Sequence, residues 1–540
     1  MPSESMDRKE RNIFNSISEG HSIKKNLKLM HVDRGAGKKR TSVRILFAAL
    51  LICSTLFVYF PSINVVFIND QLSYFLELDG ETSLGSGFQL LDYGAQRQYN
   101  KGDEVLYRPL LFTFLAVENS LLKRNFKLWN LANICLHILV VFLLFTILWR
   151  INYTSLAFGF ALLFGLLMSN FALVTLHHLG GYLIGYGLLL IALWAAREMA
   201  SDGESIGLRW FRLYGCAMTG AMLLHEIAVI ASLAVIAYVG WCRRRQFNTE
   251  SKRYIVALGV PVLFYAMLYS FHVWQCERFL WIDTHGANNS PIEYLLNIFL
   301  LIVYWLQHIF LPVSGQMVFS YMHFSSWSLD YGKWIPHMIV PGFLWIVVLI
   351  CIGRGFERKH FKESLPFAML ISFLIVSYAG INVFGRSSHA LQISHYDYFP
   401  ALFGAVLLYS LVDFSKVRSA KKTLALVCLF LLAFYNGLEI RKNSRLVHEM
   451  YKPVASYLEL VEREVRQKLS RSDFSFFIKA IPPELDIRIK GGVGYPDQGN
   501  VVEMHLLRAL YGKYYNSENP MELYVIKKIQ PDKLDLLVVK

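Results

Sequence analysis

The stretch VVFINDQLSYF, residues 65 to 75, places a carboxylate directly after a long apolar run. Asp70 stands just beyond that run, and Asn69 precedes it. A carboxylate can take a proton from a hydroxyl group, or orient that group, when it lies within hydrogen-bond reach. The pattern indicates Asp70 as a candidate acid of a reaction site at the edge of a membrane.

Other polar side chains fall near the same side of the predicted membrane segments. Ionisable residues at membrane depth are costly, so they usually line a cavity or pair with one another. These residues come from distant parts of the chain, and we expect them to converge on one outward-facing polar cavity. The candidates are Tyr107, Arg108, His137, His177, His178, His225, Glu226, Arg386, His395, Tyr396 and Asp397.

Structural explanations are open for several of these residues. Asn130, Asn133 and His137 recur at helical spacing on one face, which hydrogen bonds between helices explain. Glu226, where a span reverses, can pair with the adjacent histidine or with an arginine. Arg108 can reach lipid phosphates from the membrane edge.

The remaining motifs favour packing over chemistry. His177 and His178 are adjacent and point in different directions on a helix, so they do not indicate a metal site. The sequence GGYLIGYG, residues 180 to 187, favours close helix packing over a phosphate cradle, because no strand precedes it. Seven cysteines are scattered through mostly apolar segments without metal-ligand spacing, which is typical of packing residues.

The elements that carry these residues are predicted from composition. The chain has 540 residues, 54% hydrophobic and 17% charged, with a mean hydropathy of +0.37. Its apolar residues come in blocks able to cross roughly 30 Å of hydrocarbon, which predicts an all-α polytopic membrane protein with about eleven transmembrane helices. The expected spans are 43–67, 128–148, 155–176, 181–197, 210–224, 227–242, 253–274, 336–352, 364–382, 398–414 and 423–439.

Charge asymmetry predicts the orientation of the chain. Residues 1–44 carry eleven Lys or Arg and five Asp or Glu, whereas 68–106 carry two basic and seven acidic residues. The positive-inside rule then places the N-terminus in the cytoplasm and the first loop outside. The same rule explains the net charge of +14, so we expect no nucleic-acid partner.

Three regions follow from these patterns. Residues 1–42 form a basic cytoplasmic arm, and 43–439 form the transmembrane domain with a first outer loop over 68–108. The helix over 107–122 is expected to be interfacial, and 294–313 re-entrant or interfacial. Residues 440–540 are more charged and predict a small α/β tail domain outside the membrane.

Five segments, in order, carry a resemblance to a known group. FIND (67–70), YRPL (107–110) and WNLANICLH (129–137) resemble the GT-C superfamily of membrane glycosyltransferases. The resemblance is strongest to its protein O-mannosyltransferase-like and transmembrane-and-tetratricopeptide (TMTC) branches. LLHEIAVIASL (223–233) resembles their Lys-Glu segment, and SHYDYFPALFGAVLL (394–408) resembles their Arg-Tyr-x-Tyr-x-Pro segment. The tetratricopeptide repeats are absent from this sequence.

The resemblance implies transfer of a sugar from a polyprenyl-phosphate-linked donor to a protein, lipid or glycan acceptor on the non-cytoplasmic face. Asp70 would be the base, or the acid that orients the acceptor, in an inverting displacement. The departing phosphate needs cationic or hydrogen-bonding partners. The resemblance implies substrate-binding roles for Asn69, Tyr107, Arg108, His137, His225, Glu226, Arg386, His395, Tyr396 and Asp397.

The chain departs from the family pattern in three places. Many relatives carry two adjacent acids where this chain has Asn69 and Asp70, so a paired-acid metal site is not supported and a divalent cation is left open. A second acid could come from elsewhere in the loop, from Glu77, Asp79 or Asp92. His225 replaces the usual Lys before Glu226, and His395 replaces the usual Arg, which makes the charge there depend on pH.

We therefore expect a multi-pass, membrane-lipid-embedded glycosyltransferase of the bacterial inner membrane. Two rivals are a transporter or flippase for lipid-linked sugars, and a catalytically inactive GT-C-like binding protein. A transport path would use the same polar side chains, but transporters usually have broken helices in two corresponding halves, which the sequence does not indicate. The single acid at Asp70 keeps the inactive alternative open.

Overall fold

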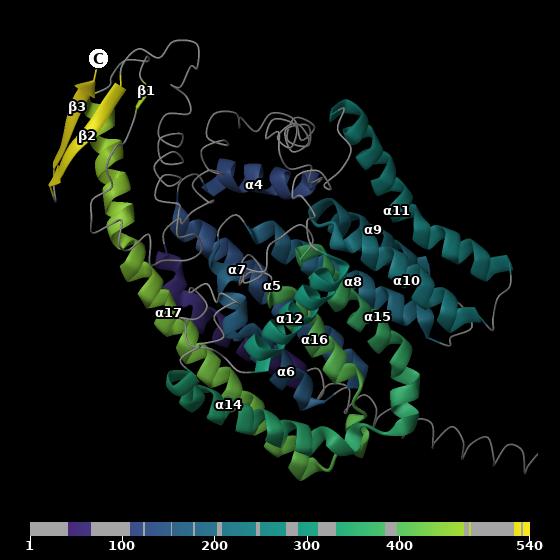
Figure 1. Ribbon diagram of the computed structural model, residues 1–540. Helices are drawn as coiled ribbons and strands as arrows, with labels where there is room; N and C mark the ends of the chain where they lie inside the picture. The colour runs from purple at the N-terminus through teal and green to yellow at the C-terminus, as the bar shows by residue number, and fades with distance from the viewer. Residues whose placement is uncertain are drawn as a thin grey trace, which may run out of the picture. The chain divides into compact units, whose positions relative to one another are not determined.

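The structure is a computed structural model, shown as a ribbon in Figure 1. It describes residues 42–65, 108–122, 125–152, 154–176, 179–201, 208–244, 249–276, 290–310, 331–383, 397–468, 475–476, 523–530 and 533–539. The chain divides into two compact units, Met1–Cys53 and Ser54–Lys540. The described residues of the first unit are helical, and those of the second are mostly helical.

The described helices follow the apolar segments that the sequence predicted. The labelled α-helices are α4 (Pro109–Leu122), α5 (Phe126–Asn152), α6 (Ser155–Gly165), α7 (Phe171–Thr175), α8 (Gly180–Ala200), α9 (Leu208–Leu224), α10 (Ile227–Arg243), α11 (Thr249–Cys276), α12 (Pro291–Phe310), α14 (Tyr331–Ile352), α15 (Arg358–Val383), α16 (Tyr398–Ser410) and α17 (Ser419–Lys468). The short 3-10 helices are η1 (Phe60–Asn64), η2 (Met168–Asn170), η5 (Gly353–Gly355) and η8 (Phe414–Lys416).

Five of the described helices are long and apolar enough to cross a membrane, and a bent pair raises this to six. These features fit an integral membrane protein. Other apolar helices, such as α10 and α16, are shorter, so the expected total of about eleven crossings stays a prediction. The long candidates are Ser42–Asn64, Phe126–Asn152, Gly180–Ala200, Arg358–Val383 and Ser419–Arg445.

The span expected over residues 155–176 is broken. Its two parts, which end and begin near Gly165 and Met168, are bent by 49°. A break frees backbone groups that lipid cannot satisfy, so they need partners inside the protein. Asn170 Nδ2 donates to the Phe164 carbonyl at 2.5 Å, and the Met168 N–H donates to Asn436 Oδ1 at 3.0 Å. Buried amides therefore stabilise the interrupted helix.

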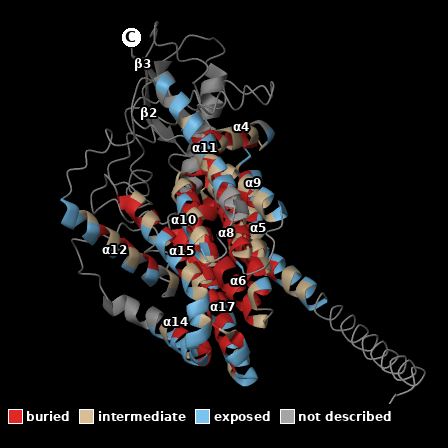
Figure 2. Ribbon diagram, turned by 90° about the vertical axis from the view of Figure 1, so that its right-hand side faces the viewer, coloured by how far each residue is buried: buried red, intermediate tan, exposed pale blue. Residues whose placement is uncertain are grey.

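The buried residues concentrate on α5, α6, α8 and α16. Figure 2 shows those of α5, α6 and α8 in red. Large apolar side chains on α11, α12 and α14 are instead exposed, among them Val256 at 70%, Ile292 at 80% and Phe343 at 63%. Exposed apolar side chains on long apolar helices are expected where the surrounding medium is lipid. The polar residues of interest are carried by the inner helices.

Glycines bring α4 and α9 close to α8. A Cβ atom at Gly180 would lie 3.1 Å from a ring carbon of Phe114 in α4, and one at Gly185 would lie 3.3 Å from Leu224 Cβ in α9. These approaches match the packing role predicted for GGYLIGYG. Figure 1 shows α4 lying across the end of α5 rather than beside it, and the interfacial placement expected for 107–122 stays a prediction.

The C-terminal part differs in detail from the expected layout. The sequence predicted a last span over 423–439 and a separate tail from residue 440, whereas α17 continues through that boundary to Lys468. Strands β1 (Ser475–Phe476), β2 (Leu523–Gln530) and β3 (Lys533–Val539) form one sheet in that order. β1 is parallel to β2, and β2 is antiparallel to β3. Most of 469–522 lies outside the described residues, so the α/β tail domain stays a prediction.

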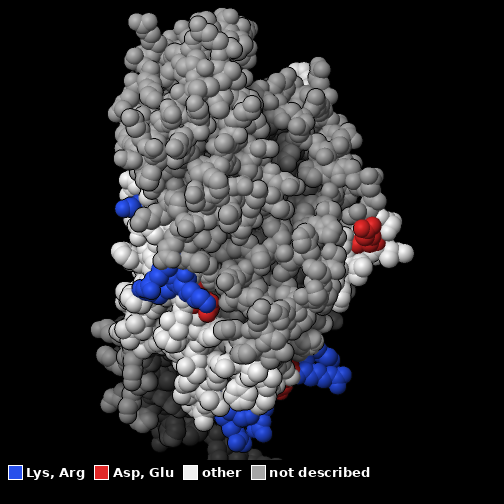
Figure 3. Space-filling view, turned by 60° about the vertical axis from the view of Figure 1, so that its left-hand side comes forward, with Lys and Arg blue, Asp and Glu red and all other residues white. Residues whose placement is uncertain are grey.

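Basic side chains gather at particular places on the described surface. On the face in Figure 3 the Lys and Arg side chains form clusters, two of which lie at the lower edge of the view. The turn between α16 and α17 contains Lys416 and Arg418, and the first turn of α17 contains Lys421 and Lys422. This turn follows the tenth of the expected spans, so a cytoplasmic N-terminus would place it in the cytoplasm, and that orientation stays a prediction.

Candidate functional site

Arg108 and Glu226 form the central ion pair of the site. Arg108 lies directly before α4, and Glu226 lies in the turn between α9 and α10. Arg108 Nε donates to Glu226 Oε2 at 2.7 Å, and Arg108 Nη2 donates to Oε1 at 2.5 Å. Their side chains are only 12% and 25% exposed. A two-pronged, charge-assisted pair of this kind fixes both the position and the plane of the guanidinium.

Tyr182 of α8 completes the contact between these elements. Arg108 Nη1 donates to the Tyr182 hydroxyl, and the Arg108 guanidinium carbon lies 5.4 Å from the centre of the Tyr182 ring. Because Glu226 already balances the charge of Arg108, a phosphate at this point would share the guanidinium with that carboxylate. The cluster can therefore position an anion through hydrogen bonds more readily than attract it through net charge.

His225 shapes the turn beside this pair. The backbone N–H of Ile227 donates to His225 Nδ1 at 3.2 Å, so that nitrogen presents a lone pair and a neutral ring carries its proton on Nε2. His225 Nδ1 lies 3.6 Å from Glu226 Oε2, beyond hydrogen-bond distance. The side chain is buried and acts on the start of α10 as a capping group does, by accepting a backbone N–H.

His137 of α5 uses both ring nitrogens inside the protein. The Gly165 carbonyl, 2.9 Å from Nε2, can only accept, so Nε2 donates to it. The Tyr398 hydroxyl then donates to Nδ1 at 2.9 Å. His137 is fully buried, and its partners lie at the break after α6 and at the start of α16. This geometry holds three elements together.

The two asparagines on the same face of α5 also bind backbone groups. Asn130 Nδ2 donates to the Val65 carbonyl at 2.7 Å, and Asn133 Nδ2 donates to the Leu176 carbonyl at 3.1 Å. Both carbonyls lie at helix ends, where no N–H within the helix reaches them. The stripe makes the hydrogen bonds between elements that the sequence pattern predicted.

A row of aromatic side chains joins the two histidines. The His225 ring lies 5.2 Å from the Tyr182 ring and 5.8 Å from the Tyr186 ring. The Tyr186 ring stacks on Tyr398 at 5.9 Å, and its hydroxyl lies 2.8 Å from that of Tyr378. We call Tyr182, His225, Tyr186, Tyr378 and Tyr398 the aromatic row. It connects the Arg108 pair to His137 through unbroken contacts.

Sequence reasoning identified only His225 in this row and missed its four tyrosines, although Tyr398 lies within the segment 394–408 that carries the resemblance. Tyr182 and Tyr186 are four residues apart on α8 and so share a helix face. That spacing could have indicated that the two side chains belong to one site. Tyr378 lies in the middle of α15, where nothing in the local sequence separates it from an ordinary core residue.

Asp397 lies next to the other end of the row. It is fully buried and directly precedes Tyr398, the first residue of α16. A carboxylate at a helix N-terminus is favoured by the helix dipole. The structure thus places Asp397 next to Tyr398, whose hydroxyl contacts His137.

The other predicted site residues lie outside the described residues. The structure therefore brings together Arg108, Glu226 and His225, and it links His137 to Tyr398, but it does not test the meeting of these groups with Asp70. Among the described residues no group of three or more His, Cys, Asp or Glu could hold a metal ion. The residues that are not described are Asn69, Asp70, Tyr107, His177, His178, Arg386, His395 and Tyr396.

Comparison with known proteins gives a likeness of structure only. No protein-family model matches the sequence, and no curated protein matches it. Two crystal structures of ArnT from Cupriavidus metallidurans, one bound to undecaprenyl phosphate and one in the apo state, are similar to this chain. Each shows 13% sequence identity and a TM-score of 0.46, and covers 90% of this chain and 93% of ArnT. The branch of glycosyltransferases predicted from the sequence stays a prediction.

Proposed function

We propose that the chain is a GT-C-type membrane glycosyltransferase that moves a sugar from a polyprenyl-phosphate-linked donor to an acceptor on the non-cytoplasmic face. The observation that supports this proposal is the pairing of Arg108 with Glu226. These residues belong to two of the segments that carry the family resemblance, 118 positions apart. The resemblance requires such segments to meet in space.

The proposed reaction is an inverting displacement. The acceptor hydroxyl attacks the anomeric carbon and passes its proton to Asp70, while the bond from that carbon to the carrier phosphate breaks. The polyprenyl phosphate leaves with the bonding electron pair, and its added charge needs nearby donors. Arg108 is the candidate donor among the described residues, and Arg386 and His395 are candidates outside them. The resemblance leaves a divalent cation open.

The pairing with Glu226 defines what Arg108 can contribute. Its guanidinium is held in one plane by the two contacts to the carboxylate and by the Tyr182 hydroxyl. A preorganised donor of this kind stabilises developing charge without reorganising during the reaction. In this proposal Glu226 and Tyr182 are positioning residues, and Asp70 is the catalytic base.

The first experiment measures release of polyprenyl phosphate. Purified protein in detergent is mixed with undecaprenyl-phosphate-linked sugar and a panel of protein, lipid and glycan acceptors. We expect release that depends on the acceptor, and we expect Asp70→Asn to lower it by about 100-fold or more. Glu293→Gln, an exposed acid in the first turn of α12, is the matched control and should release at the normal rate. Normal turnover in folded Asp70→Asn would reject the assignment of the base.

One feature favours transport as the second candidate function. The bend of 49° between Ser155–Gly165 and Met168–Thr175 makes a discontinuous helix, which is common where transporters bind their substrates. Transporters of that design repeat the feature in their other half, and only this one pair occurs among the described helices. Movement of the intact lipid-linked sugar across liposomes, without cleavage to polyprenyl phosphate, would support transport and contradict the proposed enzyme.

A further inference from the structure

A cavity of about 570 Å³ lies at the end of the bundle that carries the basic turns. It is walled by the last residues of α8 and α10, the first turns of α15 and the end of α16. Arg197 in its wall is fifteen residues beyond Tyr182 on the same helix, a separation of roughly 22 Å at 1.5 Å per residue. The cavity is therefore separate from the Arg108 cluster, and its size suits a small ligand or a lipid headgroup.

The walls of this cavity are held by hydrogen bonds. Buried Arg243 donates from Nε to the Met199 carbonyl at 3.0 Å and from Nη2 to the Ser201 carbonyl at 2.5 Å, which fixes α10 to the end of α8. His360 Nε2 lies 3.2 Å from the Ser410 carbonyl and joins α15 to α16. The cavity is thus a built feature of the fold.

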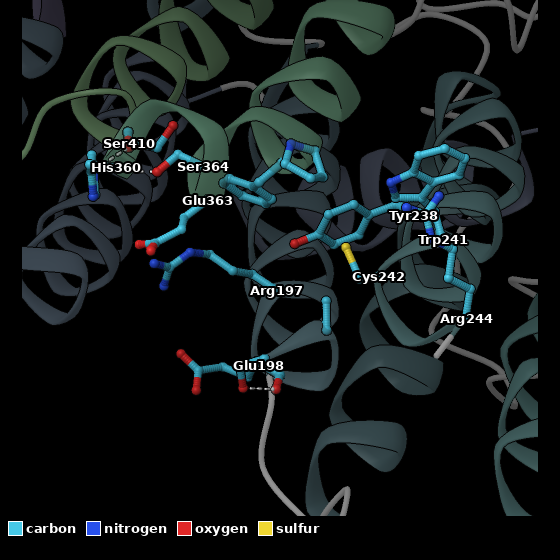
Figure 4. Close-up of a pocket in the computed structure, with 14 residues that line it drawn as sticks. Arg197, Glu198, Tyr238, Trp241, Cys242, Arg244, His360, Glu363, Ser364 and Ser410 are labelled. Carbon is cyan, nitrogen blue, oxygen red and sulfur yellow. Dashed lines mark hydrogen bonds between the residues drawn. The ribbon is translucent and has the colours of Figure 1, made fainter. Parts of the chain in front are cut away.

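Arg197 is the unusual residue in the lining. It is half-buried and packs with its guanidinium carbon 5.9 Å from the centre of the Phe367 ring. No carboxylate in the described part of the chain forms an ion pair with it, although Glu363 lies on the same side of the cavity in Figure 4. Because no described carboxylate is within salt-bridge distance, the half-buried guanidinium can take an anionic group as a further hydrogen-bond partner.

The lining also carries acids, which a simple anion would disfavour. The Glu198 carboxylate accepts from Trp194 Nε1 at 3.1 Å, and Glu363 is exposed at the rim. A ligand with both an anionic and a cationic group would match Arg197 and these acids together. A bare phosphate would match the arginine alone.

The surroundings indicate that the ligand is a lipid. Trp241 in the lining is 60% exposed. Met369 lies two residues after the lining residue Phe367 on α15 and is 63% exposed. Apolar side chains of this size next to a charged cavity are typical of the membrane interface, where a headgroup meets its acyl chains. The acyl chains would lie along these exposed side chains of α10 and α15.

The aromatic lining favours a primary ammonium over a quaternary one. Quaternary ammonium groups are recognised on open aromatic faces. The Trp241 ring is already covered by Arg244, whose guanidinium carbon lies 3.8 Å from the ring centre. A primary ammonium can instead donate hydrogen bonds to Glu198 and Glu363.

We propose that this cavity binds the headgroup of a zwitterionic phospholipid with a primary ammonium, with its phosphate at Arg197 and its ammonium at Glu198 and Glu363. Under the predicted orientation the lipid belongs to the cytoplasmic leaflet. The site is independent of the proposed transferase reaction, because it needs neither donor nor acceptor.

Lipid binding to delipidated full-length protein in detergent tests the proposal, with native mass spectrometry as the readout. We expect phosphatidylethanolamine to bind about tenfold more tightly than phosphatidylcholine or phosphatidylglycerol. Arg197→Gln should weaken that binding by about tenfold or more, because a charged hydrogen bond is lost. Arg209→Gln is the matched control, since Arg209 also lies over a ring, that of Trp210, and lies outside the cavity lining.

One further variant and one soluble control complete this test. If Arg197→Gln does not fold, Glu363→Gln at the exposed rim should reduce the preference for phosphatidylethanolamine over phosphatidylglycerol. Soluble phosphoethanolamine at equal concentration should bind far more weakly than the lipid, and equal binding would overturn the lipid assignment. Tighter binding of phosphatidylglycerol, or equal losses in Arg197→Gln and Arg209→Gln, would overturn the proposed site.

Discussion

Two arginines near opposite ends of α8 are in opposite situations: Arg108, which precedes α4 and contacts Tyr182 near the start of α8, and Arg197 in the last turn of α8. At the first end, Arg108 is held by Glu226 and Tyr182 before any ligand arrives. At the other end, Arg197 lies half-buried beside a cavity, and no described carboxylate pairs with it. Both arginines are cationic and lie at helix ends, so the difference comes from their neighbours and not from residue type.

Arg108 is thus preorganised by protein groups, whereas Arg197 is available to bind a ligand. The Glu226 carboxylate fixes the plane of the Arg108 guanidinium and neutralises its charge. This suits a group that must donate hydrogen bonds at a defined place. Arg197 has no direct ion pair with a described carboxylate, although Glu198 and Glu363 line the same cavity, and this leaves its guanidinium available to an anionic group. The stability of the protein should therefore depend strongly on the first arrangement and weakly on the second.

The largest effect is expected from breaking the matched pair. Glu226→Gln removes the counter-charge of Arg108, and a largely buried charge that loses its partner costs about 3 kcal/mol of unfolding free energy. The measurement is unfolding of purified protein in detergent. Glu363→Gln is the control for the other end and should change the unfolding free energy by less than about 0.5 kcal/mol. Equal effects of the two substitutions would contradict the comparison.

The second variant of this pair separates charge from packing. Arg108→Gln combined with Glu226→Gln removes both charges, so the double variant should be more stable than Glu226→Gln alone. A double variant that is less stable than either single one would mean that the pair contributes through shape rather than through charge compensation.

The contrast between the two ends was only partly visible in the sequence. Apolar runs predicted the helices, and the spacing of Asn130, Asn133 and His137 predicted hydrogen bonds between elements. The sequence also allowed an arginine partner for Glu226. It did not identify Arg108 as that partner, because a pairing across 118 positions depends on how α4 packs against α8 and α9.

Two structural features had no clear indication in the sequence. The break after Gly165 contains no proline, and it depends on Asn436 of a distant helix, which binds the Met168 N–H. The cavity beside Arg197 depends on four helix ends that meet in space. Local patterns predict elements well, whereas sites made by the meeting of elements need the tertiary arrangement. Asp70, the centre of the sequence hypothesis, lies outside the described residues and stays a prediction.

A smaller effect should follow from loosening the far end of the aromatic row. Tyr398→Phe removes the hydroxyl that donates to His137 Nδ1 and leaves a fully buried acceptor unpaired, which costs about 1–3 kcal/mol. Tyr409→Phe is the comparison, because its hydroxyl is bonded at 3.0 Å to the Thr154 hydroxyl, which is only partly buried and can turn to another partner. Thermal unfolding of the two variants should rank Tyr398→Phe as the less stable. The reverse order would mean that the hydrogen bond to His137 contributes little.

The smallest effect concerns a half-buried acid at the end that carries the basic turns. Asp413 accepts from the Ser415 N–H at 2.9 Å and from Ser415 Oγ at 2.6 Å, and the hydrogen bond from the Ser415 hydroxyl is the main reason that its pKa is lowered from the ordinary value of 3.8. A lowered folded-state pKa adds stability above the unfolded pKa, and this is lost as the pH falls through the folded value. Asp413→Asn should therefore be slightly less stable than the parent at neutral pH, and the difference should vanish in acid. A difference in unfolding temperature that persists unchanged below pH 3 would show that Asp413 acts through its shape rather than its charge.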